Sequence, residues 1–182
     1  MKIAVIGRGN VGGGLARRWR EAGHDVQELG RDGGDASESE AALLAVPSNA
    51  IADALASVSG LEGVPVVDAT NAMRGRPEGF DSLAEYVRSL TGGPVAKAFN
   101  TNFATLYDRL GEARTPPTMV YAADDEAREV TERLIADAGY EPVSAGGLDA
   151  ARAVEDFLAV IFAVSRAGTG PFVYRFAPPD SL

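Results

Sequence analysis

The sequence has no cysteine and only one histidine, His24, among its 182 residues. The lack of cysteine excludes disulfides, thiolate metal sites, CxxC redox pairs and a cysteine nucleophile. With one imidazole, a histidine-rich zinc site and an ordinary Ser-His-Asp triad are hard to assemble. We therefore expect no metal bound by the protein's own side chains, and a structural role for His24.

Positive charge and long apolar runs are also scarce. The net charge is −9, so nucleic acid would be repelled and is not expected as a partner. The longest apolar run, Phe157–Val164, is far shorter than the roughly 18 residues of a membrane helix. Residues 1–6 lack the charged head and cleavage site of a signal peptide. We expect no membrane partner and a cytoplasmic protein.

Short apolar segments alternate with segments of helical period along the whole chain. This alternation predicts an α/β fold of the Rossmann type, doubly wound around a mainly parallel sheet. In the first helix, Val11, Leu15, Trp19 and Ala22 fall on one face, which should pack on the sheet, and Gly23 should cap it. The strand-like segments are 3–6, 24–29, 41–46, 64–67, 95–99, 118–122 and 140–143, and the helix-like segments are 11–22, 51–58, 83–90 and 130–138.

The connection between the second and third strand-like segments is unusually short. It spans residues 31–40 and is rich in glycine, serine and acid. A crossover helix alone needs about a dozen residues, so one βα unit is predicted to be shortened here. The sheet edge beside the second strand should then be exposed or covered by a partner. No linker divides residues 1–182, which are expected to form a single domain with a frayed tail at 178–182.

A glycine-rich turn follows the first strand. Residues 7–12 read Gly-Arg-Gly-Asn-Val-Gly and fit G-x-G-x-x-G between a strand and a helix. In this motif Gly7 permits the tight turn, Gly9 lets a pyrophosphate approach the backbone, and Gly12 allows close helix packing. Arg8 can add a charge-assisted contact to the phosphates. The turn therefore predicts dinucleotide binding, with a merely structural glycine turn as the alternative.

The end of the second strand bears on the choice between NADP and NAD. Glu28 has nearly the spacing of a ribose-binding carboxylate but should still lie inside the strand. Arg31 falls in the loop, where a guanidinium can meet a 2′-phosphate. Asp32 could neutralise Arg31 or bind ribose itself. These residues favour NADP(H) over NAD(H), with a solvated loop charge as the alternative for Arg31.

Several stretches resemble the NADPH-dependent reductase family that includes the NADP oxidoreductases of the deazaflavin coenzyme F-420 and the cytoplasmic domain of Steap-type metalloreductases. The most family-specific run is Lys-Ala-Phe-Asn-Thr at 97–101, and the short connection at 31–40 resembles a compact subgroup that lacks the third strand. The matching stretches are IGRGNVGGGLARRWREAGHDV, LLAVP at 43–47, VVDATNAMRG at 66–75, VAKAFNTNFATL at 95–106 and, near the C-terminus, GGLDAARAVE followed by GPFVYRF.

The resemblance implies roles for individual residues. Where the family has Gly-Ser-Arg after the second strand, for the 2′-phosphate, this chain reads Leu29-Gly30-Arg31, keeping the arginine and losing the serine. Val46 and Pro47 would border the cofactor's ribose, and Ala98, with Asn71, would lie beside the nicotinamide. The turn residues implied to hold the pyrophosphate are Gly7, Arg8, Gly9, Asn10 and Val11.

Other polar residues have two readings each. Asn100 and Thr101 are substrate candidates because, with Asn71 and Asn102, they follow predicted strands, where ligands of open α/β sheets bind, although such residues also cap turns. Lys97 could reach solvent or attract an anionic acceptor. Arg74 and Arg76 are either solvated or contact the anionic tail of a large cofactor. Residues 124–126, Asp-Asp-Glu, begin a predicted helix. Their negative charges are expected to interact favourably with the helix dipole and not to be catalytic.

The last helix, at about 147–167, has apolar side chains nearly all around its circumference. Such a helix is either buried in the core or forms an interface, and we expect a homodimer built on it. The segment 168–176 would then form a lid or subunit contact near the nicotinamide.

Hydride transfer depends more on proximity and exclusion of water than on a protein acid or base, so a chain poor in histidine and cysteine can support it. We expect an NADP(H)-binding oxidoreductase that passes hydride between the nicotinamide and coenzyme F-420, a flavin or another small-molecule redox acceptor. The catalytic residues are not identified by the sequence. A non-catalytic sensor of the NADPH to NADP ratio and a flavin-assisted metal reductase are the alternatives.

Overall fold

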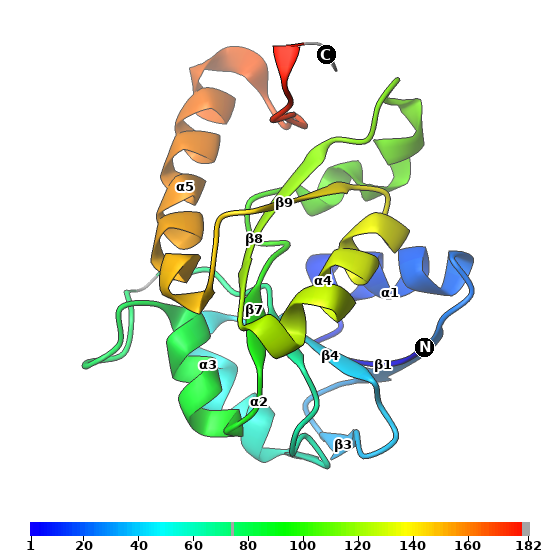
Figure 1. The fold of residues 1–182 in the computed structure, drawn as a ribbon, viewed down its shortest axis with the longest axis vertical. Coiled ribbons are helices and arrows are strands. Elements are labelled where there is room, and N and C mark those ends of the chain that lie inside the picture. Colours follow the sequence, from blue (N-terminus) through cyan, green and yellow to red (C-terminus); the bar gives the residue numbers. More distant parts are fainter. Residues whose placement is uncertain (74, 180–182) are drawn as a thin grey trace.

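A computed structural model describes residues 1–73 and 75–179. The alternatives for Arg74 and the fraying predicted for residues 180–182 therefore lie outside the described residues. A seven-stranded sheet forms the centre, in the order β2-β1-β4-β6-β7-β8-β9, and every neighbouring pair is parallel except β7 and β8 (Figure 1). The strands are β1 (Lys2–Ile6), β2 (Asp25–Leu29), β4 (Ala41–Leu44), β6 (Val66–Asp68), β7 (Val95–Lys97), β8 (Thr118–Ala123) and β9 (Glu141–Ser144). The predicted α/β, mainly parallel Rossmann-type architecture is confirmed.

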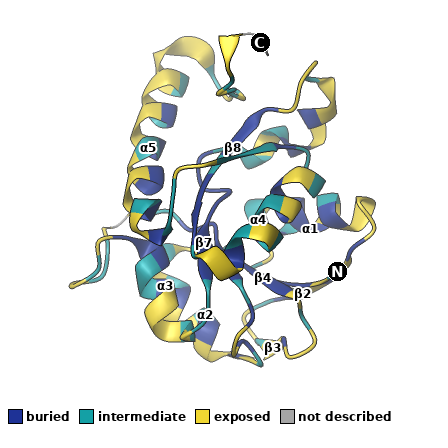
Figure 2. Ribbon diagram, in the orientation of Figure 1, coloured by how far each residue is buried: buried dark blue, intermediate teal, exposed yellow. Residues whose placement is uncertain are grey.

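Helices cover both faces of the sheet because the strand side chains alternate between two apolar layers. In β1, Ile3 and Val5 face one layer and Ala4 and Ile6 face the other. The first layer is closed by α1 (Asn10–Glu21), the 3-10 helix η2 (Ala104–Glu112) and α4 (Asp125–Asp137). The second is closed by α2 (Ile51–Ala56), α3 (Leu83–Thr91) and α5 (Ala151–Val164), and the buried positions line the sheet between them (Figure 2).

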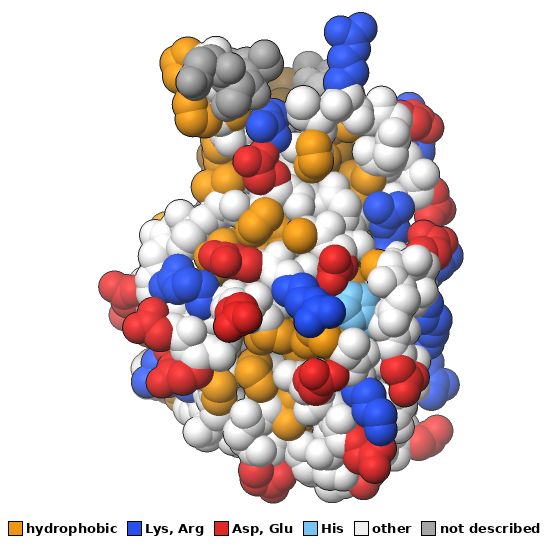
Figure 3. Space-filling model, turned by 45° about the vertical axis from the view of Figure 1, so that its right-hand side comes forward, with side chains coloured by type: hydrophobic (Ala, Val, Ile, Leu, Met, Phe, Trp, Pro, Cys, Tyr) orange, Lys and Arg blue, Asp and Glu red, His pale blue; other side chains and the backbone are white. Residues whose placement is uncertain are grey.

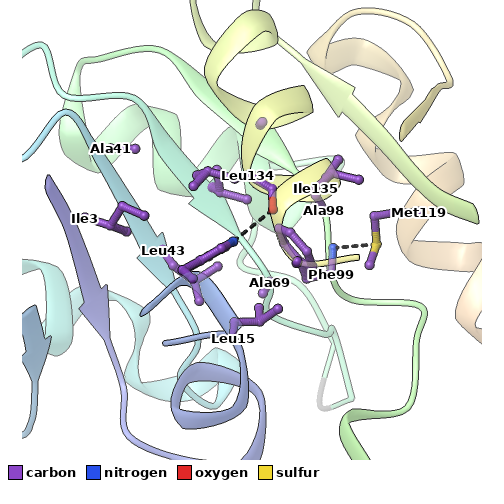
Figure 4. Packing of buried hydrophobic residues seen from close by; sticks show 14 of the residues in the cluster. Ile3, Leu15, Ala41, Leu43, Ala69, Ala98, Phe99, Met119, Leu134 and Ile135 are labelled. Atoms are coloured by element: carbon purple, nitrogen blue, oxygen red, sulfur yellow. Dashed lines mark hydrogen bonds between the residues drawn. The ribbon is translucent and has the colours of Figure 1, made fainter. Parts of the chain in front are cut away.

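The side of α1 that faces the sheet and α4 carries the buried residues of this helix. Leu15 and Trp19 are fully buried, and the Trp19 indole nitrogen donates to the Leu134 carbonyl at 2.9 Å. Figure 4 shows Leu15, Ile3 and Leu43 converging with residues of α4 in this layer. Ala22, predicted on the same face, is exposed because it follows the last helical turn. Gly23 ends the helix at φ +89°, as predicted.

The second strand lies at the edge of the sheet, and the following connection contains no helix. Two short strands, β3 (Gly34–Asp35) and β5 (Val58–Ser59), pair with each other beside the main sheet and add nothing to its order. The chain then enters β4 directly. The shortened βα unit predicted from residues 31–40 is thus confirmed.

The C-terminal part packs at the opposite side of the fold. After α5, a π-helical turn (Ser165–Thr169) leads to a segment that runs beside β8, where Thr118 N donates to Tyr174 O at 2.8 Å. Phe157 contacts Tyr174 with ring centroids 5.5 Å apart. In this structure the segment contacts β8 and α5, and its predicted role as a lid or subunit contact near the nicotinamide stays a prediction.

Among the described residues, no helix is both long enough and apolar enough to span a membrane.

Tyr107 should make the protein sensitive to alkali. It is buried against Gly14, and burial raises its pKa above the usual value, with a smaller contribution from Tyr140. In the unfolded chain Tyr107 ionises near pH 10, so above that pH the unfolded state binds fewer protons and stability falls. Tyr107→Phe should therefore lose less stability than the wild type between pH 9 and 11. Urea unfolding at several pH values measures this, and parallel losses in both proteins would contradict it.

Candidate functional site

The turn after β1 is shaped by two glycines that the fold itself requires. Gly7 has φ +110°, and a Cβ on it would lie 2.3 Å from the Ala45 carbonyl oxygen. A Cβ on Gly12 would lie 1.9 Å from the Gly7 carbonyl oxygen. Because neither residue has a Cβ, the start of α1 can pack closely against β1 and β4. Both glycines therefore have the roles that the motif predicted.

Gly9 differs because no packing contact in the described part of the chain requires its lack of a side chain. Its backbone is extended, at φ −76° and ψ −169°, and among the described residues other than its chain neighbours a Cβ on it would meet no atom within 4 Å. It is the N-cap of α1, no side chain caps this end, and the first turn of α1 has no acidic residue. The first amides of α1 are thus left for an anion from outside the chain.

A first hollow of about 800 Å³ runs from this turn toward the end of β2. It lies outside the carboxyl ends of β1, β2 and β4, where open α/β sheets bind ligands. One wall comes from α2, and the other from the turn and the loop after β2. Its lining residues are Ile6, Gly7, Arg8, Gly9, Gly30, Arg31, Ala45, Val46, Pro47, Asn49, Ala50, Asp53, Ala54 and Ser57.

A second hollow of about 310 Å³ extends from the same turn in the other direction, toward the end of β6. It shares Gly9, Ala45, Val46, Pro47 and Asn49 with the first, so the two form one trough across the strand ends. Its remaining lining residues are Asn10, Val11, Ser48, Ala69, Thr70, Asn71 and Met73, and none of the described residues that line it is ionisable.

Most predicted cofactor residues meet in this trough. The five turn residues, Gly30, Arg31, Val46, Pro47 and Asn71 all line it. Ala98 does not: it is fully buried in the core at the end of β7, so its place beside the nicotinamide stays a prediction.

Asn100 contacts the trough indirectly, through a hydrogen bond with Asn71. It is buried, and its carbonyl oxygen accepts from Asn71 Nδ2 at 3.1 Å. Its own Nδ2 donates to the Val154 carbonyl at 3.3 Å. Phe99, just before it, has φ +61°, which turns the chain after β7. In this structure Asn100 therefore orients Asn71 and does not itself line the trough.

Thr101 and Asn102 are engaged elsewhere. The Thr101 hydroxyl lies 2.7 Å from the Tyr174 hydroxyl, and Asn102 Nδ2 donates to the Thr118 carbonyl at 3.2 Å. Burial raises the pKa of Tyr174, and the hydrogen bond with Thr101 partly offsets this. These contacts fix the C-terminal segment, so a role for Thr101 with substrate stays a prediction.

Lys97 neither reaches solvent nor faces an open site, and both readings of it were wrong. It is fully buried, with Nζ 2.8 Å from Asp68 Oδ2, 2.6 Å from the Thr70 carbonyl and 3.2 Å from Glu155 Oε1. Asp68 also accepts from the Thr70 amide at 2.8 Å. The buried ion cluster of Lys97, Asp68 and Glu155 thus holds the backbone of Thr70, which lines the second hollow.

Arg76 belongs to the edge of the same cluster. Its Nε lies 2.8 Å from Glu155 Oε2, and its guanidinium lies 2.7 Å from Asp156. The side chain is mostly buried, so the interpretation of Arg76 as a solvated charge is wrong. Its contacts with α5 also argue against its reaching a cofactor.

The structure confirms part of what the sequence predicted for the residues at the end of β2. Glu28 lies inside the strand, as predicted, and its carboxylate pairs with Arg20 at 2.7 Å. Arg31 is exposed in the following turn. Arg8 Nη2 donates to the Glu28 carbonyl at 2.9 Å, which directs its side chain toward the end of β2.

Sequence reasoning missed one wall of the first hollow. Ala50, Asp53, Ala54 and Ser57 line it from α2 and its ends. Their spacing of three, one and three residues places them on one helical face, a signal that the sequence did contain. Met73, two-thirds exposed at the second hollow, was missed as well.

The remaining candidates are structural. His24 Nε2 lies 2.8 Å from Asp137 Oδ2 in a buried position, in line with the role predicted for it. Asp124 precedes α4, with Asp125 and Glu126 in its first turn, as the dipole argument predicted. In the described part of the chain, no three acidic or histidine side chains gather as a metal site would require.

Comparisons with models of protein families and with curated proteins gave no match. Among solved structures, a protein from Arthrobacter sp. FB24, provisionally described as an F420-dependent NADP-reductase, has a TM-score of 0.82 at 24% identity. The match covers 98% of this chain and 100% of that one. The hypothetical protein SMa0349 from Sinorhizobium meliloti has a TM-score of 0.65 at 27% identity, over 82% of this chain and 87% of that one.

A reductive aminase from Aspergillus terreus, solved in complex with NADPH, has a TM-score of 0.69 at 15% identity. This match covers 92% of the present chain and 63% of the aminase. The resemblance to F-420-dependent NADP reductases that the motifs indicated is therefore confirmed at the level of the fold, along nearly the whole chain.

Proposed function

We propose that this protein is an NADP(H)-binding oxidoreductase that passes hydride between the nicotinamide and a deazaflavin, a flavin or another small acceptor. One observation carries the proposal. Two hollows meet at an uncapped helix N-terminus, beside a glycine whose missing side chain serves no purpose in the fold. That arrangement suits a molecule with a pyrophosphate at its centre and a ring system at either end.

The trough suggests which half of the cofactor lies where. The amides of Gly9, Asn10 and Val11 would bind the phosphates. The first hollow, with Arg31 and the wall of α2, would take the adenosine half. The second, with Val46 and Asn71, would take the nicotinamide half, and Asn71 is already oriented by Asn100.

The second hollow also indicates the kind of chemistry. Bound nicotinamide supplies or accepts a hydride, which needs alignment of two rings more than a proton donor. The described residues here are apolar, amide or hydroxyl, with no acid, base or cation among them. They can position a ring and exclude water. This composition supports redox transfer over acid-base catalysis and supports an organic acceptor.

The experiment is a screen of acceptors with purified protein. NADPH absorbance is followed with coenzyme F-420, FMN, a ferric complex or a quinone in separate reactions, and NADPH binding is measured in parallel. We expect NADPH to bind and to be oxidised with a planar organic acceptor. Binding without oxidation by any acceptor would overturn the enzymatic proposal in favour of a redox sensor, and oxidation only with iron and flavin would favour a metal reductase.

We also propose that a second copy of this chain covers the outer side of α5. Val160 and Val164 are 53% and 40% exposed there, one helical turn apart, while Leu158 and Ile161 face the core. Val164→Asp should therefore convert a dimer into monomers without loss of fold, since a charge cannot be buried unpaired. Sedimentation of wild type and variant measures this, and a monomeric wild type would refute it.

A further inference from the structure

Glu155 is a carboxylate of α5 that lies in the interior of the protein. On the face shown in Figure 3, acidic and basic side chains lie next to each other at the surface. By contrast, the described part of the chain buries the charged groups of Asp68, Lys97 and Glu155 together, and the Glu155 side chain is 1% exposed. Burying charges costs free energy, and apolar side chains of similar size are often as stable. The contacts of Glu155 therefore indicate what it does beyond stabilising the fold.

The two carboxylate oxygens of Glu155 hold both ends of the segment between β6 and α3. Oε1 lies 3.2 Å from Lys97 Nζ, which in turn lies 2.6 Å from the Thr70 carbonyl oxygen just after β6. The same Oε1 accepts from the amide of Leu83, the first residue of α3, at 2.7 Å. Oε2 accepts from Arg76 Nε at 2.8 Å. One side chain of α5 thus fixes where this segment leaves the sheet and where it enters the next helix.

The preceding residue of α5 makes a second connection to the same segment. The Val154 carbonyl accepts from Asn100 Nδ2 at 3.3 Å, and the Asn100 carbonyl accepts from Asn71 Nδ2 at 3.1 Å. Thr70 and Asn71 are consecutive, and both line the second hollow, as does Met73. Two adjacent residues of α5 therefore set the position of one wall of this hollow, although none of the described residues that line it belongs to α5.

The first hollow takes no part in these connections. Its walls come from the turn after β1, the loop after β2, and α2 with its ends. Within the described residues, the hydrogen bonds and ion pairs of Glu155 reach none of the residues that line it. A change at Glu155 should therefore affect the two ends of a bound dinucleotide unequally.

We propose that Glu155 is a positioning residue that acts through Lys97 and Thr70 to shape the second hollow for the nicotinamide ring. The inference rests on the proposed function, which places the nicotinamide half in that hollow and the adenosine half in the first. Hydride transfer requires the ring to be held in one orientation, and a displacement of about 1 Å can lower the rate about a hundredfold. Glu155 does not line the hollow itself, but holds the backbone that does.

The test compares binding of NADPH with binding of 2′,5′-ADP, which lacks the nicotinamide half, to the wild type and to Glu155→Gln. Glutamine keeps the size of the side chain but removes the negative charge that faces Lys97 and Arg76. Calorimetry should show 2′,5′-ADP affinity within about twofold of the wild type and NADPH affinity about five- to tenfold lower. The fluorescence emission of bound NADPH should also move toward that of the free nucleotide, because the ring is held less firmly. General destabilisation would not separate the two nucleotides in this way.

Two further variants sharpen the comparison. Asp156→Asn is the matched control, because Asp156 follows Glu155 on α5 but is 54% exposed, and its ion pairs within the described residues are with Arg76 and Arg152. It should change neither affinity by more than about twofold. Asn100→Ala removes the connection to the Val154 carbonyl and leaves the buried ion cluster intact. It should give the same unequal loss, and it tests the inference even if Glu155→Gln does not fold.

Equal weakening of NADPH and 2′,5′-ADP binding in these two variants would overturn the inference, as would unchanged affinities and unchanged emission. A wild type that binds NADPH no tighter than 2′,5′-ADP, with the emission of the free nucleotide, would also overturn it, because no ring would then be held in the second hollow. If the wild type binds neither nucleotide, the proposed function itself fails.

Discussion

Gly9→Ala should leave the fold intact and lower the affinity for NADPH about a hundredfold, or nearly 3 kcal/mol in binding free energy. The structure has room for this methyl group, since no described residue other than the chain neighbours of Gly9 has an atom within 4 Å of it, and the extended backbone of Gly9 suits alanine. The room is the space through which a pyrophosphate would approach the amides of α1. Fluorescence titration with NADPH measures the affinity, and urea unfolding measures the fold.

Two other glycines provide the controls. Gly111→Ala also places a methyl group where nothing lies within 4 Å, but in η2, so it should leave NADPH affinity unchanged. Gly12→Ala should disturb the fold itself, because its Cβ would overlap the Gly7 carbonyl. If Gly9→Ala bound NADPH as tightly as the wild type, the turn would not be the phosphate site.

Lys97→Met should destabilise the protein by about 3–5 kcal/mol, the usual cost of breaking a buried ion pair. Methionine has a similar length and fits the space, but it cannot neutralise Asp68 or Glu155. Both carboxylates would then remain buried without their shared cation, and the Thr70 carbonyl would lose its donor. The free energy of unfolding in urea at neutral pH measures the effect.

Lys2→Met is the matched control, because Lys2 is an exposed lysine that pairs with Glu38 at 2.6 Å. Exposed pairs contribute little, so this variant should unfold at nearly the same urea concentration as the wild type. A Lys97→Met protein that also matches the wild type would show that the buried cluster does not stabilise the fold.

Much of the fold was predictable because its signals are local. Three patterns can each be recognised from residues that are close in the sequence: the alternation of apolar segments, the glycine turn and the ten-residue connection at 31–40. The antiparallel pairing of β8 with β7 is not local: it depends on how the chain returns after η2, which no periodicity encodes. The short β3–β5 pair was missed for a different reason, because two residues are too few to give a strand pattern.

The site was predicted where a motif sets the backbone and missed where side chains meet across the fold. The turn residues, Val46 and Pro47 belong to short stretches next to strand ends. Lys97 was misread because its partners lie 29 and 58 residues away, on β6 and α5. Thr101 meets Tyr174 across 73 residues, a contact that only the folded C-terminal segment creates.

The central claim is that the first amides of α1 bind the pyrophosphate of a nicotinamide dinucleotide. Amide NMR spectra recorded during a titration with NADP⁺ test it directly. The account predicts saturable shifts at Gly9, Asn10 and Val11, accompanied by shifts at Gly30 and Arg31 along the first hollow. Signals from this turn that stay unmoved at saturating nucleotide, or shifts confined to another part of the protein, would contradict it.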